Sequence, residues 1–210
     1  MNSAPSRVRG QAQRQTSPGN GGTVPTPAEP AAEQVVLLDP HHQPIGTAPK
    51  ANVHTTDTPL HLAFSCWVVN DDGQVLLTRR ALSKKTWPGV WTNSFCGHPG
   101  PGEDFQDAIT RRAAQELGME ITNLQEVLPD FAYRAVDASG VVENEFCPVW
   151  VAQAASQPRP QASEIAEFTW VDPADLLVAS RGLARVFSPW LVEEIAEQPL
   201  QESLGLAAGS

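Results

Sequence analysis

The pattern of apolar and polar residues changes several times along the chain, and each pattern predicts a kind of element. Residues 62–69 (LAFSCWVV) are almost continuously apolar, which predicts a strand that is buried on both faces. Residues 70–73 (NDDG) are typical of a tight turn, and residues 74–78 (QVLLT) form the partner strand of this predicted hairpin. Residues 104–117 carry apolar side chains at helical spacing and predict the strongest helix of the chain.

Residues at the ends of these segments support the assignment. Asp104 can cap the start of the predicted helix, and Gly118 can end it in a left-handed conformation. Ser188 and Pro189 mark the start of another helix. The folded part begins with an apolar run at residues 35–38. Further extended segments are predicted at residues 91–95, 131–136, 141–152 and 168–171, and further helices at 173–179 and 189–196. Strands on both sides of one central helix predict an α+β fold, an α/β sandwich in which helices flank a mixed β-sheet.

Composition divides the chain into three parts. Residues 1–33 contain five prolines, four glycines and no aromatic residue, so we expect a disordered N-terminal tail. Residues 199–210 are expected to form a flexible C-terminal tail. Residues 34–198 are then left for a single domain, which is within the usual range of domain sizes.

Charge and cysteine content exclude several classes of partner. Fourteen Lys and Arg against 24 Asp and Glu give a net charge of −10, which argues against binding to nucleic acid. The chain lacks an apolar run of about 18 residues, so insertion into a membrane is not expected. Three cysteines do not suggest a disulfide framework, and the N-terminus lacks a secretory pattern, so we expect a cytoplasmic protein.

One spaced motif resembles the Nudix box, in which glutamates hold Mg²⁺ against a diphosphate. It reads Gly97-x5-Glu103-x7-Arg111, followed by Glu116-x-Gly118. Two box glutamates are replaced here, by Arg112 and Gln115. Water activation needs several carboxylates, so the replacements favour diphosphate binding over diphosphate cleavage. Arg112 can either grip a phosphate or form an ordinary ion pair with Glu116 one turn later.

Histidines and carboxylates suggest a second metal site. Cys96 and His98 lie two residues apart, as do Glu143 and Glu145 on an otherwise apolar strand, so each pair shares a face if it is extended. Two buried carboxylates need a partner, and a metal ion is an obvious one. The candidate ligands for a divalent transition ion are His54, His61, His98, Glu143 and Glu145. Taken singly, each histidine would rather be interpreted as a surface or hydrogen-bonded residue.

Cations and aromatic residues add a candidate anion site and a candidate pocket wall. Residues 78–85 (TRRALSKK) contain four cations in a strongly acidic chain. Such a run usually forms a solvated face, but next to a loop that binds Mg²⁺ it favours an anion-binding patch. Trp190, at the start of a capped helix, either belongs to the core or lines a pocket in which its ring stabilises a cation.

Together these segments resemble the type 1 isopentenyl-diphosphate Δ-isomerases of the Nudix superfamily. The resemblance is carried by PLHLAFSCW from Pro59, TRRALSKKTWPGVWTNSFCGHP from Thr78, the degenerate box, and GVVENEFCPVW from Gly140. It extends from about Val35 to about Glu197 and implies a Nudix-like fold. It also implies a 1,3-allylic rearrangement, in isoprenoid biosynthesis, that converts isopentenyl diphosphate into dimethylallyl diphosphate.

The resemblance further implies roles for individual residues. Cys96 and Glu145 match the acid/base pair, and Tyr133 and Trp190 match aromatic residues beside the reacting isoprenyl group. The transition-metal ligands, for Zn²⁺ or Mn²⁺, match His54, His61, His98, Glu143 and Glu145; the Mg²⁺ site matches Glu116 and the backbone carbonyl of Cys96; the diphosphate-binding cations match Lys50, Arg80, Lys84 and Arg112. A small-molecule diphosphate substrate and a monomer or weak homodimer are expected.

Moving a double bond requires one group that donates a proton to the alkene and another that removes a proton, on either side of a dry pocket. Glu145 is the expected acid, with Tyr133 as a relay, and Cys96 is the expected base, as a thiolate activated by nearby cations. Reversal of the reaction exchanges these duties. Two alternatives remain open: a Nudix hydrolase of a nucleoside or other diphosphate, and a catalytically silent Nudix module that binds a diphosphate or a protein.

Overall fold

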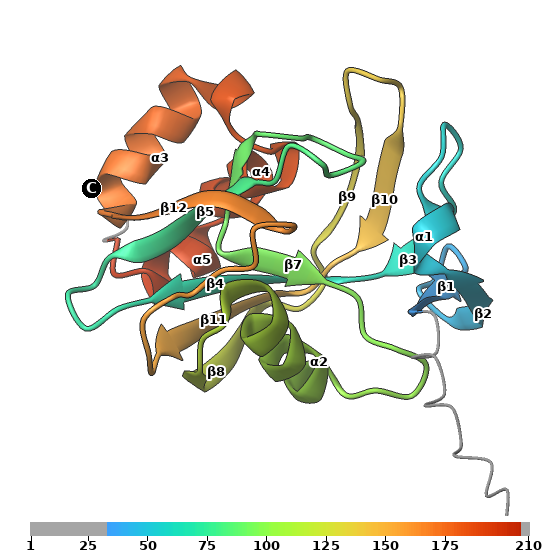
Figure 1. Ribbon diagram of the computed structural model, residues 1–210, viewed down its shortest axis with the longest axis horizontal. Helices are drawn as coiled ribbons and strands as arrows, with labels where there is room; N and C mark the ends of the chain where they lie inside the picture. Colours follow the sequence, from blue (N-terminus) through green and yellow to red (C-terminus); the bar gives the residue numbers. More distant parts are fainter. Residues whose placement is uncertain (1–32, 207–210) are drawn as a thin grey trace, which may run out of the picture. The chain divides into compact units, whose positions relative to one another are not determined.

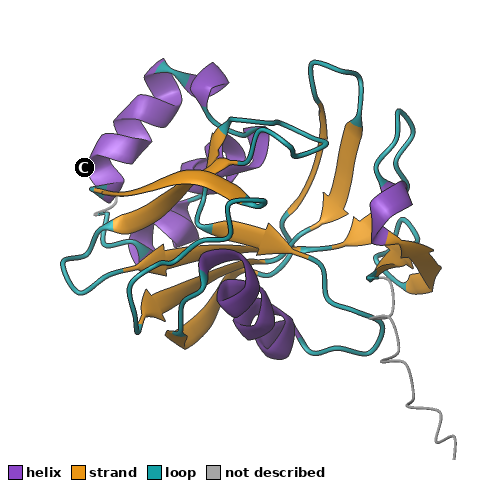
Figure 2. Ribbon diagram, in the orientation of Figure 1, coloured by secondary structure: helices purple, strands orange, loops and turns teal. Residues whose placement is uncertain are grey.

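The structure, a computed structural model, describes residues 33–206, so the predicted N-terminal tail lies outside the described residues except for Glu33. The described residues form two mixed β-sheets with helices on both faces of the larger one (Figures 1 and 2). The smaller sheet has the strand order β2-β1-β3-β10-β9. Its strands are β1 (Gln34–Leu38), β2 (Pro44–Pro49), β3 (His61–Leu62), β9 (Ala132–Val136) and β10 (Val142–Phe146).

The larger sheet has the order β12-β5-β4-β11-β8, with β6 paired to β5 and β7 paired to β4. Its strands are β4 (Phe64–Val69), β5 (Val75–Arg80), β6 (Trp91–Thr92), β7 (Phe95–Gly97), β8 (Ile121–Leu128), β11 (Val149–Ala154) and β12 (Ile165–Val171). The hairpin predicted between β4 and β5 is confirmed, since the Gly73 N–H donates to the Asn70 carbonyl.

The two sheets meet where the chain passes twice from the smaller sheet into the larger one. β3 and β10 are parallel neighbours in the smaller sheet, and β4 and β11, which follow them, are parallel neighbours in the larger sheet. β3 is followed by β4 after Ala63, and β10 is followed by β11 after Cys147 and Pro148. The predicted single strand over residues 141–152 is therefore wrong: it is two strands in two sheets. Pro148 has no N–H to donate to a β-ladder, which favours a break at this point.

The helices are α1 (Lys50–Val53), α2 (Phe105–Arg112), α3 (Pro173–Gly182), α4 (Pro189–Ala196) and α5 (Gln198–Ser203), with a π-helical turn η1 (Ala113–Leu117) and a 3₁₀ turn η2 (Ala184–Val186). The Asp104 side chain caps α2 by accepting from the Gln106 N–H, and Gly118 ends η1 with a φ of 58°. The predicted caps of α2 and α4 are thus confirmed, Ser188 accepting from the Leu191 N–H.

Alternate side chains of β4 enter two separate cores, as expected for a strand buried on both faces. Phe64 and Cys66 pack with α2, while Trp67 packs with Leu191 of α4 and Leu200 of α5. In Figure 1, α2 lies on one face of the larger sheet and α3, α4 and α5 lie on the other.

The chain departs from the predicted C-terminal tail, because residues 198–203 form α5. Leu200 and Leu204 are buried in the core, so this segment adds apolar burial that the tail was not expected to supply. Among the described residues, none of the helices combines the length and the apolar character needed to cross a bilayer.

Candidate active site

A cavity of about 600 Å³ lies where the two sheets meet α1, η1 and α4. It brings together nearly all the residues singled out in the sequence. Its wall includes the predicted catalytic residues Cys96, Tyr133, Glu145 and Trp190, the predicted diphosphate-binding cations Lys50, Arg80, Lys84 and Arg112, and the predicted metal ligands His54, His98, Glu116 and Glu143. His61 is fully buried behind this wall.

Glu145 is the centre of an imidazole–carboxylate cluster. It lies in register with His61 on β3 and with Tyr133 on β9, because β10 pairs with both strands. Its Oε1 atom is 3.0 Å from His98 Nε2, 3.3 Å from His61 Nε2 and 4.0 Å from His54 Nε2. One ligand atom from each of these four residues lies within 4.8 Å of the others.

Glu143 lies outside this group of four but contacts it. Its Oε2 atom is 2.8 Å from His54 Nε2, and its Oε1 atom accepts a hydrogen bond from the Thr86 hydroxyl at 2.7 Å. The five side chains expected to bind a transition metal are therefore adjacent, with Glu143 at the His54 side of the cluster.

The chemistry of these donors fits a bound cation. His61 Nδ1 is 3.0 Å from the Pro59 carbonyl oxygen, which can only accept, so Nδ1 carries a proton, and in the neutral imidazole Nε2 then presents a lone pair. That lone pair is buried, lacks a hydrogen-bond donor among the described residues and faces the Glu145 carboxylate. Two electron-rich atoms in this arrangement repel each other unless a positive ion lies between them.

Electrostatics within the cluster are uneven. Burial disfavours the charged form of His54, but contacts with Glu143 and Glu145 outweigh burial and raise its pKa to about 9. Burial lowers the pKa of His98 to about 4. Burial also opposes ionisation of Glu145, yet the three imidazoles hold its pKa well below the usual range.

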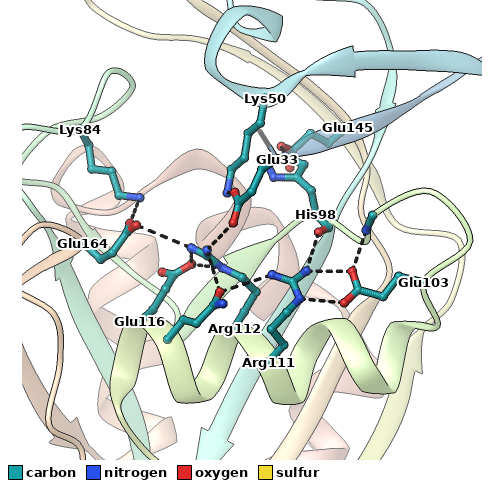
Figure 3. A network of polar contacts seen from close by, with 12 residues as sticks. Glu33, Lys50, Lys84, His98, Glu103, Arg111, Arg112, Glu116, Glu145 and Glu164 are labelled. Atoms are coloured by element: carbon teal, nitrogen blue, oxygen red, sulfur yellow. Dashed lines mark hydrogen bonds and ion pairs between the residues drawn. The ribbon is translucent and has the colours of Figure 1, made fainter. Parts of the chain in front are cut away.

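Three of the four predicted diphosphate-binding cations are paired with carboxylates (Figure 3). Glu33 contacts Lys50 Nζ at 2.7 Å and Arg112 Nη1 at 3.5 Å. Arg112 also forms an ion pair with Glu116, but both residues are buried and line the cavity, so the pair does not lie on a solvated face of the helix. A further carboxylate, Glu164, pairs with Lys84 and lies 3.7 Å from Arg112 Nη2.

Arg80 and Glu103 have different surroundings. Arg80 donates to the Thr86 carbonyl oxygen, and its guanidinium carbon is 5.3 Å from the centroid of the Trp190 ring. Glu103, the first carboxylate of the box, accepts from Arg111 Nε at 2.7 Å and from the Gly100 N–H at 2.7 Å. Glu103 therefore holds the loop before α2 in place.

The inner end of the cavity is apolar. Tyr133, Trp190, Cys147 and Ala63 form a buried cluster against which Cys96 packs. The ring centroids of Tyr133 and Trp190 are 5.6 Å apart, and the Tyr133 hydroxyl donates to Glu145 Oε2 at 2.9 Å. An aromatic wall thus lies next to the carboxylate that is hydrogen-bonded to it.

Cys96 differs from its expected state. The sequence suggested a thiolate stabilised by nearby cations, but burial, and then the charges of Glu194 and Glu145, raise the pKa of this thiol well above its usual range. Three of the four cavity cations, Lys50, Lys84 and Arg112, are paired with carboxylates instead. The surroundings of Cys96 therefore favour the thiol over the thiolate.

Several polar residues of the site were not recognised in the sequence. Glu33 and Glu164 were missed because their partners are far away along the chain, and no local pattern marks them. Asn93 lies within the string WTNS that carried the resemblance, and this was the one signal that could have drawn attention to it.

Comparison with known proteins decides the family. The family model described as NUDIX domain matches residues 59–191. The isopentenyl-diphosphate Delta-isomerase of Kocuria rhizophila is 64% identical over 173 residues, which cover 82% of this chain and 96% of that protein. That of Paenarthrobacter aurescens is 56% identical over 180 residues, or 86% of this chain and 98% of that protein. This chain belongs to the isopentenyl-diphosphate Delta-isomerase family.

Solved structures agree on the fold of this isomerase family member. A protein of Deinococcus radiodurans superposes with a TM-score of 0.61 at 18% identity, covering 78% of this chain and 98% of that one. The MutT protein of Methanosarcina mazei gives a TM-score of 0.52 at 19% identity, covering 69% and 96%. The predicted α+β Nudix fold is confirmed, and the degenerate box belongs to an isomerase family within it.

Proposed function

We propose that this chain converts isopentenyl diphosphate into dimethylallyl diphosphate, the activity expected of an isopentenyl-diphosphate Delta-isomerase. One observation supports this most strongly: Cys96 and the hydrogen-bonded pair Tyr133–Glu145 line the same cavity, whose outer part is rich in cations. That arrangement offers two proton-transfer groups for an alkene and a binding site for its diphosphate.

The reaction needs one proton added and one removed. Protonation of the terminal alkene carbon places positive charge on the tertiary carbon, and loss of a proton from the carbon nearer the diphosphate re-forms the double bond. Glu145 with Tyr133, and Cys96, supply these two transfers, one as donor and the other as acceptor in each direction. Trp190 offers its ring to the developing positive charge.

Lys50, Arg80, Lys84 and Arg112 are the proposed diphosphate-binding residues. They hold the polar end of the substrate near the cavity mouth and so direct its isoprenyl end to the apolar cluster around Trp190. Arg112 and Gln115 replace carboxylates that a Nudix hydrolase would use to activate water, which disfavours cleavage of the diphosphate.

The proposed transition-metal ligands are His54, His61, His98, Glu143 and Glu145, with Zn²⁺ or Mn²⁺ as the ion. A cation bound there would withdraw electron density from the Glu145 carboxyl and so change its affinity for a proton. Glu116 and the Cys96 carbonyl are proposed to hold Mg²⁺ together with the diphosphate; the side chain of Glu116 lines the cavity, and its Oε1 accepts from Arg112 Nε at 2.8 Å.

Direct turnover tests the proposal. Protein loaded with Mg²⁺ and either Zn²⁺ or Mn²⁺ is incubated with isopentenyl diphosphate, and the products are separated by chromatography. We expect the dimethylallyl isomer, with losses in kcat of about a hundredfold or more for Cys96→Ser and for Glu145→Gln. Glu126→Gln, an exposed substitution on β8, serves as the control and should retain activity.

Two outcomes would contradict this function. If folded, metal-loaded protein yields no isomer, the isomerase function is ruled out. Release of inorganic phosphate from the substrate would instead favour a hydrolase. The expected monomer or weak homodimer stays a prediction that sedimentation can measure.

A further inference from the structure

Glu194 on α4 is a buried carboxyl for which the proposed reaction has no use. It is fully buried, and it forms no ion pair with any residue between 33 and 206. Its Oε2 atom accepts from Trp67 Nε1 at 2.6 Å and from the Ser65 hydroxyl at 2.9 Å. Its Oε1 atom is buried and has no hydrogen-bond partner among the described residues. Burial of a carboxyl oxygen without a hydrogen bond costs free energy, so the presence of Glu194 at this position calls for an explanation.

Ser65 connects Glu194 to the cavity. Ser65 and Cys96 are direct neighbours across the ladder between β4 and β7, so their side chains share a face of the sheet. The single hydroxyl proton of Ser65 goes to Glu194 Oε2, while Ser65 Oγ accepts from Asn93 Nδ2 at 2.8 Å. Towards Cys96 Sγ, 3.8 Å away, Ser65 can therefore present only a lone pair.

Asn93 has a fixed orientation as well. Its Nδ2 atom donates to the carbonyl oxygens of Cys66 and Phe95, each at 3.1 Å, and its Oδ1 atom accepts from Trp190 Nε1 at 3.0 Å. Carbonyls only accept and an indole N–H only donates, so these partners determine which end of the amide is which. Asn93 Oδ1 then faces Cys96 Sγ at 3.4 Å.

Both oxygens beside the Cys96 sulfur are thus acceptors, and the direction of the Ser65 hydrogen bond depends on Glu194. We propose that Glu194 is a positioning residue of the isomerase reaction, which acts through Ser65 and Asn93 to hold the Cys96 thiol and the Trp190 indole in one arrangement. The inference rests on the proposed function. Without an acceptor at position 194, the Ser65 hydroxyl is free to turn towards Asn93 or Cys96.

Two replacements of Glu194 distinguish a role in positioning the site from a role in packing. Glu194→Gln keeps an oxygen acceptor for Ser65 and Trp67, whereas Glu194→Met fills similar space without one. We expect kcat to fall about tenfold in Glu194→Met with KM changed by less than about twofold, and Glu194→Gln to restore kcat to within about threefold of the parent. Glu193→Met, on the exposed neighbouring residue, is the matched control and should behave as the parent.

A second pair of variants tests the route through Ser65. Ser65→Ala should lower kcat as Glu194→Met does, and the double variant should lose no more than about twofold beyond either single variant, because both remove the same connection. Parent-like kcat in Ser65→Ala, equal losses in Glu194→Gln and Glu194→Met, or multiplied losses in the double variant would each overturn the proposal. Ser65→Ala also provides the test if Glu194→Met does not fold.

A spectroscopic measurement keeps this inference separate from the proposed function. In protein labelled with ¹⁵N at tryptophan, the indole N–H resonance of Trp190 should shift in Ser65→Ala, because Ser65 is joined to that indole through Asn93. An unchanged Trp190 resonance overturns the proposed connection. An inactive parent protein refutes the isomerase function, whereas the resonance of Trp190 still reports on the hydrogen bonds.

Discussion

Two fully buried carboxyls near the cavity are driven in opposite directions by their neighbours. Glu145 meets three imidazoles, which overcome burial and lower its pKa. Burial raises the pKa of Glu194 to about 8, and its two neutral donors, Trp67 and Ser65, only partly oppose this. Neighbouring side chains therefore lower the pKa of the carboxyl on β10, whereas burial raises the pKa of the carboxyl on α4.

This contrast predicts a pH dependence of stability. A carboxyl whose pKa rises from 4.5 to about 8 on folding binds more protons in the folded state, so its contribution is complete below about pH 4.5 and is lost as the pH rises through about 8. Glu194→Gln should remove this dependence, which is on the order of a few kcal/mol between pH 5 and 8. Urea unfolding at several pH values measures it, with the exposed substitution Glu126→Gln as control.

An equal loss of stability with pH in the parent and in Glu194→Gln would show that Glu194 is already ionised in the folded protein.

At the residue scale, the sequence predicted which side chains lie close together but not how their pKa values are shifted. Spacing placed Cys96 with His98 and Glu143 with Glu145, because alternate residues of a strand share a face. The raised pKa of the Cys96 thiol could not be predicted, since it depends on burial and on Glu194, which is 98 positions further along the chain.

At the element scale, the junction between η1 and the following loop depends on one glycine. Gly118 has a φ of 58°, and a Cβ atom there would lie 2.4 Å from the backbone oxygen of Arg159. The loop is held in that place because the Arg159 N–H donates to the Leu117 carbonyl at 2.7 Å. Close approach and a left-handed backbone both explain the glycine in this position of the box.

Gly118→Ala should therefore destabilise the protein by about 3 kcal/mol or more, from backbone strain and a clash that only backbone movement relieves. Gly102→Ala is the matched control, because Gly102 also has a positive φ of 75° but a Cβ there meets nothing within 4 Å. We expect the control to cost about 1 kcal/mol. Equal unfolding free energies of the two variants in urea would show that the contact with Arg159 is unimportant.

Elements with clear periodicity and caps were predicted well, and those without were missed. Asp104 and Ser188 begin α2 and α4 as expected. In contrast, β8 has apolar residues at 121, 124 and 127–128, which is closer to helical spacing than to the alternation of a strand. It lies at one end of its sheet, where pairing with β11 rather than side-chain pattern specifies it.

At the scale of the whole molecule, the cavity forms where the two sheets adjoin, because the chain passes from one sheet to the other between β3 and β4 and between β10 and β11. Parallel pairing of β10 with β3 places Glu145 beside His61, and β7 pairs with β4 to bring Cys96 to the same region. Motifs in the sequence identified many of the site residues, but the pairing of strands that are distant in sequence determines where these residues come together. The carboxylates Glu33 and Glu164, which partner the cavity cations, follow from that pairing alone.

These carboxylates oppose the binding of a diphosphate. Glu33 joins Lys50 and Arg112, two cations that the proposed substrate would need, and its side chain is 49% exposed. Although partial burial opposes it, the charge of Lys50 and that of Arg112 lower the pKa of Glu33, which is therefore an anion at neutral pH. A diphosphate must replace this anion, or share the cations with it, before it binds.

Glu33→Gln should then lower the KM for isopentenyl diphosphate, by about threefold to tenfold at low ionic strength, because attraction of the substrate to Lys50 and Arg112 no longer competes with an internal anion. The advantage should shrink at high salt, which screens these charges. Glu167→Gln is the matched control, since Glu167 pairs at 3.3 Å with Arg79, and neither residue belongs to the described cavity lining. A higher KM in Glu33→Gln would instead mean that Glu33 helps the substrate by holding the two cations in place.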